Sequence, residues 1–145
     1  MDKINGTCVS IGNTGVLIRG RSGAGKSDLA LRLIDRGAAL VSDDYCEIEK
    51  KDGAIILSPP ATIAGQIEVR GLGIVRTEYR SHVRLDLVVD LASETGIERL
   101  PEKTTEEISG VMVAWMQVDP TRASADAKVR LKVASLHSGD KDSSR

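Results

Sequence analysis

The segment from Gly20 to Ser27 reads GRSGAGKS and fits the pattern G-x-x-x-x-G-K-[ST] of phosphate-binding loops. An apolar run precedes it and an amphipathic segment follows it, which is the strand–loop–helix context that the pattern requires. Glycines let successive backbone N–H groups turn toward phosphate oxygens, and the following helix adds the positive end of its dipole. Lys26 can then bridge the terminal phosphates, and the Ser27 hydroxyl can ligate Mg²⁺. The sequence therefore predicts that a nucleotide is bound by Gly20, Arg21, Ser22, Gly23, Ala24, Gly25, Lys26 and Ser27.

Phosphoryl transfer also needs carboxylates, which hold the metal ion and position or deprotonate the nucleophile. Asp43 and Asp44 end the run AALVSDD, directly after the helix expected behind the loop. Side chains that are adjacent on a strand point to opposite faces, so both acids can face one site only if the strand has ended. In that case one of them can serve the metal ion while the other acts as the base. Asp90, at the end of DLVVD, is interpreted as a strand-end carboxylate in a turn.

The hydrophobic pattern predicts the elements that position these residues. Alternating apolar residues predict strands over 7–11 and 15–19, joined as a hairpin, and a helix that begins near Lys26 and stops at Gly37. Further strands are expected over 38–44, 45–50, 54–58, 82–90 and 111–118, an edge strand and turn over 66–75, and a helix within 121–137. The fold class is therefore α/β, a single strand-rich domain over residues 1–137, followed by a polar, disordered tail over 138–145.

Composition excludes several classes of function. A net charge of −1 over 145 residues leaves no broad basic field for nucleic acid or for an anionic membrane surface. No apolar run approaches the roughly 20 residues that a membrane span needs, and the N-terminus lacks the features of a secretion signal. Cys8 and Cys46 are too few and too far apart to indicate a disulfide framework or a zinc site. A cytoplasmic protein with reduced thiols is expected.

In combination, these segments resemble the catalytic domain of HPr kinase/phosphorylase, a family of bacterial protein-serine kinases. The resemblance is carried by GVLI before the phosphate loop, the loop itself, a helix that ends in Arg36-Gly37, the pair Asp43-Asp44 and the signature IEVRGLGI at 67–74. It covers roughly residues 5 to 100 well and the remainder loosely. Typical members carry a separate N-terminal domain, so this sequence resembles a short form of the alphaproteobacterial type, with the C-terminal catalytic domain only.

The resemblance implies a role for each matched residue. Asp44 matches the acid that takes the proton from the acceptor serine and returns it in the reverse reaction. Lys26 matches the lysine on the phosphates, Ser27 and Glu68 match the Mg²⁺ ligands with Asp43 close to the metal, and Arg99 matches a catalytic arginine.

For the whole protein, the resemblance implies a fold related to phosphoenolpyruvate carboxykinase and assembly as a hexamer. It implies transfer of phosphate from ATP, or from pyrophosphate, to a serine of the phosphocarrier protein HPr, and phosphorolysis of phosphoserine-HPr in reverse. It also implies a role in regulating the phosphotransferase system and carbon and nitrogen metabolism.

Two departures from the family pattern leave alternatives open. Asn5 occupies the position of a family histidine, and an amide cannot change charge near neutral pH as a histidine can. The C-terminal part keeps only Pro120, Arg122 and Arg130 of an arginine-rich stretch associated with dephosphorylation, so the kinase direction is favoured over the phosphorylase direction. The alternative to a kinase is a nucleotide-binding sensor that has lost turnover, marked by Asn5. A small-molecule kinase is least favoured, because no arginine-bearing lid insertion is visible.

Overall fold

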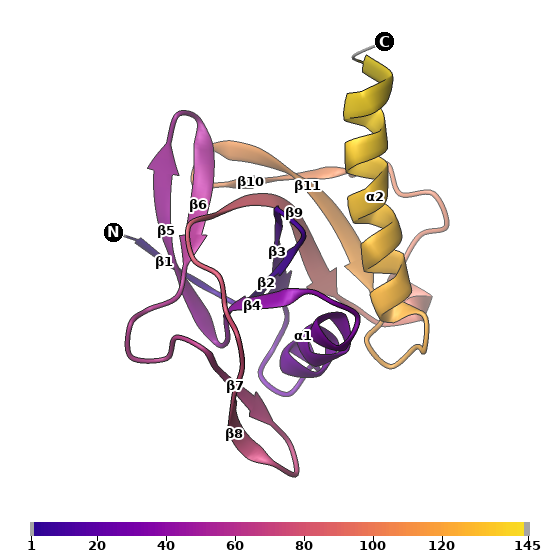
Figure 1. The fold of residues 1–145 in the computed structure, drawn as a ribbon. Coiled ribbons are helices and arrows are strands. Elements are labelled where there is room, and N and C mark those ends of the chain that lie inside the picture. Colours follow the sequence, from indigo (N-terminus) through magenta and orange to yellow (C-terminus); the bar gives the residue numbers. More distant parts are fainter. Residues whose placement is uncertain (1, 144–145) are drawn as a thin grey trace.

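The computed structural model describes residues 2–143, which form eleven strands, two α-helices and one 3-10 helix (Figure 1). In chain order these elements are β1 Asp2–Asn5, β2 Thr7–Ile11, β3 Thr14–Arg19, α1 Lys26–Asp35, β4 Ala39–Ser42, β5 Tyr45–Lys51, β6 Ala54–Ser58, β7 Gln66–Val69, β8 Gly73–Arg76, β9 Val83–Leu91, η1 Glu94–Gly96, β10 Thr105–Ile108, β11 Val111–Val118 and α2 Ala125–Ser143. Each expected strand is present, and the prediction of a strand-rich α/β fold is confirmed.

Strand β9 is the centre of a nine-stranded sheet. One of its edges pairs in parallel with β3, while its other edge pairs antiparallel with β6 near Val83 and then in parallel with β11 near its end. Strands β2 and β4 continue the sheet beyond β3, and β4 runs in the same direction as β3. The carboxyl ends of β3, β4, β9 and β11 therefore meet at one edge, where ligands bind in open α/β sheets.

Two apolar clusters occupy the two faces of this sheet. The first lies under α1 and α2, which both cover one side of the sheet, and it includes Leu33, Val89 and Val129 (Figure 1). The second lies on the opposite face, where residues of β5, β6 and β11, including Trp115, pack with Leu17 of β3. The strand β3 contributes to both clusters because its side chains alternate between the two faces. The end of β3, and with it the phosphate loop, is therefore fixed from both sides.

The end of the C-terminal helix differs from the boundary that was expected. The C-terminal helix begins at Ala125 and continues to Ser143, so the boundary expected after residue 137 does not coincide with the end of the helix; residues 144–145 lie outside the described part of the chain. Its residues Val129 and Val133 are buried, whereas Leu131 is exposed.

Both cysteines are free and buried. Neither helix within residues 2–143 has the length and apolar character that crossing a bilayer demands.

A turn at Asp119 explains why α2 begins at Ala125 and not at residue 121, where the expected segment starts. The Asp119 carboxylate accepts hydrogen bonds from the Thr121 amide and hydroxyl at 2.9 and 2.6 Å, and from the Glu94 amide at 2.8 Å. The Thr121 hydroxyl, followed by these backbone donors, lowers the pKa of Asp119 to about 2. The carboxylate thereby holds residues 119–122 in a turn and fastens η1 to the end of β11.

This turn predicts a pH dependence of stability. A carboxylate whose pKa is lower in the folded than in the unfolded state contributes stability at neutral pH, and that contribution is lost as the pH falls through the folded-state pKa. We expect Asp119→Asn to unfold at lower urea than the parent at pH 6. The difference in midpoint should shrink as the pH falls from about 4 toward 2. The exposed Asp2→Asn is the matched control, and a pH-independent difference for Asp119→Asn would contradict the prediction.

Candidate active site

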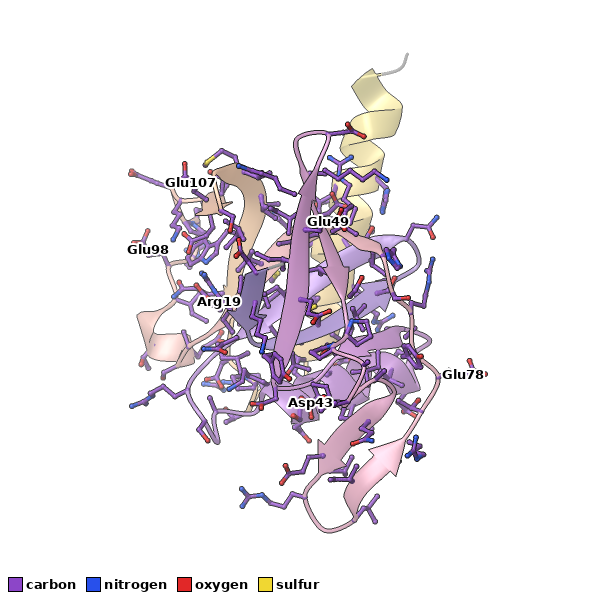
Figure 2. The ribbon with its side chains drawn as sticks, turned by 90° about the vertical axis from the view of Figure 1, so that its left-hand side faces the viewer. Arg19, Asp43, Glu49, Glu78, Glu98 and Glu107 are labelled. Atoms are coloured by element: carbon purple, nitrogen blue, oxygen red, sulfur yellow. The ribbon has the colours of Figure 1, made fainter. Side chains whose placement is uncertain are left out.

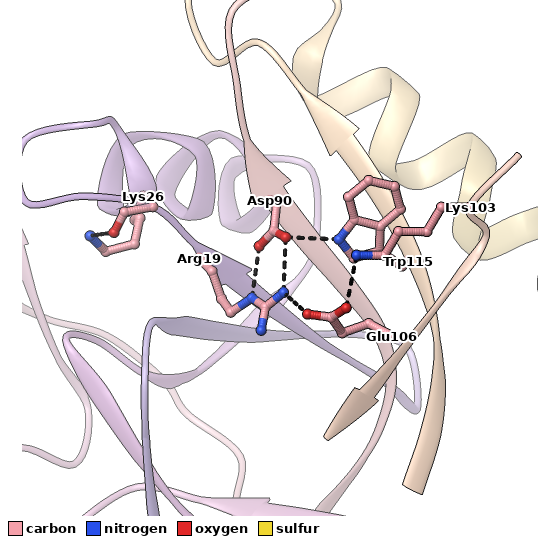
Figure 3. Close-up of polar contacts among 7 residues, drawn as sticks. Arg19, Lys26, Asp90, Lys103, Glu106 and Trp115 are labelled. Carbon is pink, nitrogen blue, oxygen red and sulfur yellow. Dashed lines mark hydrogen bonds and ion pairs between the residues drawn. The ribbon is translucent and has the colours of Figure 1, made fainter. Parts of the chain in front are cut away.

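The phosphate loop leaves β3 and enters α1 through two glycines in the left-handed region. Gly23 has a φ of 80° and Gly25 a φ of 109°, conformations that side chains with a Cβ rarely adopt. A Cβ at Gly25 would also lie 3.3 Å from Pro120, so the turn after β11 supports the loop directly. The Lys26 ammonium donates to the carbonyl oxygens of Gly20 at 2.7 Å and Arg21 at 3.0 Å. Figure 3 shows one of these two contacts. The loop thus lies between a strand and a helix, as expected, and the Lys26 ammonium contacts the carbonyl groups at the start of the loop.

Asp43 is the most connected side chain of the site. It is only 8% exposed, and its carboxylate accepts hydrogen bonds from the Ser27 hydroxyl at 2.8 Å and the Thr7 hydroxyl at 2.9 Å. The backbone amide of Asp44 donates to Oδ1 of the same carboxylate at 3.1 Å, and the Glu68 amide donates to Oδ2 at 3.0 Å. One carboxylate therefore joins the starts of β2 and α1 to β7.

Asp44 faces the same cleft as Asp43 because β4 ends at Ser42, before both acids. Its φ of 73° is left-handed, so the chain reverses the alternation that would otherwise place the two acids on opposite faces. The Gly6 amide donates to the Asp44 carbonyl at 3.0 Å and holds the turn against the end of β1. Unlike Asp43, Asp44 is exposed. The pair thus separates into a buried carboxylate beside Ser27 and an accessible one in the cleft.

The cleft has a volume of about 980 Å³ and two unlike walls. One wall consists of phosphate-loop residues and the start of α1; Ser22, Gly23, Gly25, Lys26 and Ser27 line it. The other is the hairpin of β7 and β8, which projects from the body of the domain (Figure 1) and contributes Glu68 and Arg70. At its tip Leu72 is 75% exposed, and Ile74, which lines the cleft, is 69% exposed. The space suits a nucleotide and leaves an apolar rim beside it.

The donor atoms of the cleft fit Mg²⁺. Ser27, Asp43 and Glu68 all line it, and each offers the oxygen ligands that this ion prefers. Residues 2–143 contain no group of three or more His, Cys, Asp or Glu side chains that could hold a metal ion. Mg²⁺ is usually held by one or two carboxylates together with substrate phosphates and waters, and Asp43 and Glu68 offer such carboxylates at this cleft.

The structure does not bring every predicted residue to the cleft. Arg99 is exposed in the segment between η1 and β10 and is not among the residues that line the cleft, so its catalytic role stays a prediction. Figure 2 shows its neighbour Glu98 on the far side of Arg19 from Asp43. Asn5 ends β1 opposite Tyr45, one residue from the Gly6 amide that binds Asp44.

One residue of the site has no clear signal in the sequence. Thr7 is fully buried, lines the cleft and donates to Asp43, but a single threonine at the start of an apolar strand is usual in any sheet. Only its place two residues after Asn5 could have drawn attention to it.

The chain is similar to proteins of one family over most of its length. The family described as HPr Serine kinase C-terminal domain matches residues 1–139. A protein of Aromatoleum aromaticum named HPr kinase/phosphorylase is 38% identical over 144 residues, covering 90% of this chain and 46% of that protein. A Geobacillus protein of the same name is 43% identical over 96 residues, covering 61% of this chain and 31% of that protein. The chain thus spans about a third to a half of the length of these curated relatives.

A solved structure shares the fold. It is described as the structure of the Hpr(Ser) kinase/phosphatase from Coxiella burnetii, and it superposes with a TM-score of 0.85 at 24% identity. The superposition covers 97% of this chain and 99% of that one, so the correspondence extends to both helices and the whole sheet. The chain therefore belongs to the HPr serine kinase C-terminal domain family.

Proposed function

We propose that this protein is a Mg²⁺-dependent protein-serine kinase that transfers a phosphoryl group from ATP to a serine of an HPr-like phosphocarrier protein. The observation that carries the proposal is the difference in burial between Asp43 and Asp44. The first is buried against Ser27 of the phosphate loop, and the second is accessible in the same cleft. A nucleotide-binding module needs only the first of these carboxylates, whereas a transferase also needs the second.

Each residue has a defined task in this proposal. The phosphate loop and Lys26 bind the triphosphate, while Ser27, Asp43 and Glu68 hold Mg²⁺, which neutralises charge on the phosphates when it is bound. The Asp44 carboxylate accepts the proton of the acceptor serine hydroxyl. The serine oxygen forms its bond to the terminal phosphorus, the bond to the bridging oxygen breaks, and ADP is the leaving group.

The choice of a protein acceptor rests on the wall opposite the phosphate loop. A small-molecule kinase encloses its substrate to exclude water. Here that wall is a projecting hairpin with exposed Leu72 and Ile74, which suits contact with another protein surface. The relatives are named HPr kinase/phosphorylase, which supports HPr as the acceptor protein. Regulation of the phosphotransferase system and assembly as a hexamer belong to the same proposal.

The test is a transfer assay with MgATP and HPr, in which phosphoserine is detected by intact mass. We expect HPr to gain one phosphate, and HPr whose acceptor serine is replaced by alanine to gain none. Adding inorganic phosphate to the purified phosphoserine product tests the reverse reaction in the same format. If the protein binds ATP and HPr gains no phosphate, the kinase proposal is wrong.

Asn5 supports a second candidate, a nucleotide-binding sensor without turnover. It lies at the end of β1 beside the Asp44 turn, where the family histidine could exchange a proton and an amide cannot. If the sensor is correct, the parent should bind ATP without transfer, and Asn5→His should restore transfer. If the kinase is correct, Asn5→His should mainly change how the transfer rate depends on pH between about 5 and 8. The pH profiles of parent and variant distinguish the two.

A further inference from the structure

Arg19 is the last residue of β3 and the residue directly before the phosphate loop. Its guanidinium forms a two-pronged contact with Asp90 at the end of β9, with Nε–Oδ1 at 2.7 Å and Nη2–Oδ2 at 2.8 Å. The same Nη2 also donates to Glu106 of β10 at 2.5 Å. Figure 3 shows the guanidinium between the two carboxylates. Two of the parallel strands that end at the ligand-binding edge are therefore joined immediately before the loop begins.

The two carboxylates extend this contact to the next strands. The Trp115 indole N–H, on β11, donates to Asp90 at 2.8 Å. The Lys103 ammonium lies 2.8 Å from a Glu106 oxygen and 4.1 Å from the centre of the Trp115 ring. We call these five residues, Arg19, Asp90, Lys103, Glu106 and Trp115, the Arg19 cluster. It connects four strands, from the phosphate loop to the segment 97–104.

Stability alone is a weak explanation for this cluster. Arg19 and Asp90 are each 28% exposed and Glu106 is 24% exposed, so the ion pairs are partly removed from water. The Lys103 ammonium, followed by Arg19, lowers the pKa of Glu106, and Asp90 is the largest cause of a raised pKa for Arg19. Ion pairs that lose hydration in this way often contribute no more to folding stability than apolar side chains of the same volume. What they provide is a defined direction, because a guanidinium fork fits a carboxylate in one plane.

One end of the Arg19 cluster touches the phosphate loop, and the other touches the segment that carries Arg99, whose catalytic role is a prediction. Arg19 is bonded to Gly20, where a Cβ would lie 3.2 Å from both Ala24 and Leu91, so the loop has little room to shift by itself. At the other end, the Thr104 carbonyl accepts from the Trp115 amide at 2.9 Å, and Lys103 lies four residues after Arg99. A displacement at either end is therefore passed to the other through short, directional contacts.

We propose that Arg19 is a positioning residue, which aligns the start of the phosphate loop with the segment that carries Arg99 through the Arg19 cluster. The part of this inference that concerns Arg99 rests on the proposed kinase function. The part that concerns the phosphate loop involves nucleotide binding alone. Arg19 itself does not line the cleft. Its effect is transmitted through backbone position rather than through contact with the phosphates.

The test compares Arg19→Met, Arg19→Lys and Lys103→Met with Arg84→Met as the matched control. Arg84 forms an exposed ion pair with Asp86, at 3.1 Å, six residues before Asp90 on the same strand. For each variant we would measure the Kd of a fluorescent N-methylanthraniloyl-ATP with Mg²⁺, the kcat of transfer to HPr and the Tm. The Kd needs no acceptor, so it reports on the phosphate loop even without turnover.

Arg19→Met is expected to raise the Kd and to lower kcat, each by about tenfold or more, because small displacements of binding groups are costly. Arg19→Lys keeps the charge but loses the fork, so a smaller rise of about threefold in Kd is expected. Lys103→Met should leave the Kd near that of the parent and lower kcat by about tenfold, because it releases only the Arg99 segment. Arg84→Met should change neither constant.

A purely structural role would lower the Tm of Arg19→Met while the folded protein, measured well below that Tm, keeps the parent Kd and kcat. That result would overturn the inference. If Arg19→Met does not fold, Arg19→Lys carries the test, and a parental Kd for it would be equally decisive. Failure of the proposed function looks different: the parent would bind the ATP analogue without transferring phosphate, and the Kd values of the Arg19 variants would still decide the phosphate-loop arm.

Discussion

Asp44→Asn is expected to lower the kcat of transfer to HPr by about 10²–10⁴-fold and to leave the Kd for MgATP almost unchanged. Asparagine cannot accept the serine proton, but it tolerates the left-handed conformation that Asp44 adopts at a φ of 73°. The backbone contact from Gly6 to the Asp44 carbonyl does not involve the side chain and is retained. Single-turnover phosphorylation and equilibrium binding of the nucleotide, measured on the same preparation, separate the two effects.

Asp52→Asn is the matched control for this variant. Asp52 is also an exposed aspartate with a positive φ, 52°, in the turn between β5 and β6. The same chemical change at the same kind of backbone position should leave both constants as in the parent. If Asp44→Asn phosphorylated HPr at the parental rate, another group would have to be the base.

Asp43→Asn is expected to have the second largest effect, on stability and on the metal requirement together. The buried carboxylate accepts four hydrogen bonds, and an amide would turn an NH₂ group toward some of these donors. Hydrogen bonds to a charged group contribute about 1.5–3 kcal/mol, so we expect the free energy of unfolding to fall by about 2 kcal/mol or more. The Mg²⁺ concentration for half-maximal transfer should rise, because Asp43 is the buried carboxylate beside Ser27. Urea unfolding and a Mg²⁺ titration measure these effects.

Thr7→Val separates the two parts of that prediction. It removes one donor from Asp43 and keeps the carboxylate and nearly the same side-chain shape. We expect a loss of about 1 kcal/mol in stability and no change in the Mg²⁺ requirement. An Asp43→Asn variant that is destabilised but needs no more Mg²⁺ than the parent would show that Asp43 only holds the fold together.

The elements with a clear hydrophobic period were predictable from the sequence. The strand β3, the loop glycines and α1 have the expected bounds because their pattern is local: alternation, then Gly-rich turn, then helical spacing. The strands β1 and β10 were missed. Their sequences DKIN and TEEI are mostly polar, and both are short strands whose partners β5 and β11 supply the ordering. A period within four such residues does not reveal a partner strand, whether that partner lies far along the chain, as β5 does for β1, or directly follows, as β11 does for β10.

The site shows the same limit. Asp43 and Asp44 stand out because they end a strand directly behind the phosphate loop, and the structure supplies the left-handed turn that lets both face the cleft. Asp90 was interpreted as a strand-end carboxylate in a turn, but it lies within β9 and pairs with Arg19, because β3 and β9 lie side by side. The sequence offers no measure of that adjacency. Contacts between strand ends are therefore what the structure adds to the candidate site.

The left-handed conformation of Asp44 also determines which substitutions this position can accept. Glycine and asparagine adopt a φ near 73° readily, whereas a β-branched side chain there would be strained. The backbone therefore narrows the exchanges that could remove the carboxylate without disturbing the turn that Gly6 holds. Relatives that had lost the base would be expected to carry asparagine or glycine at this position.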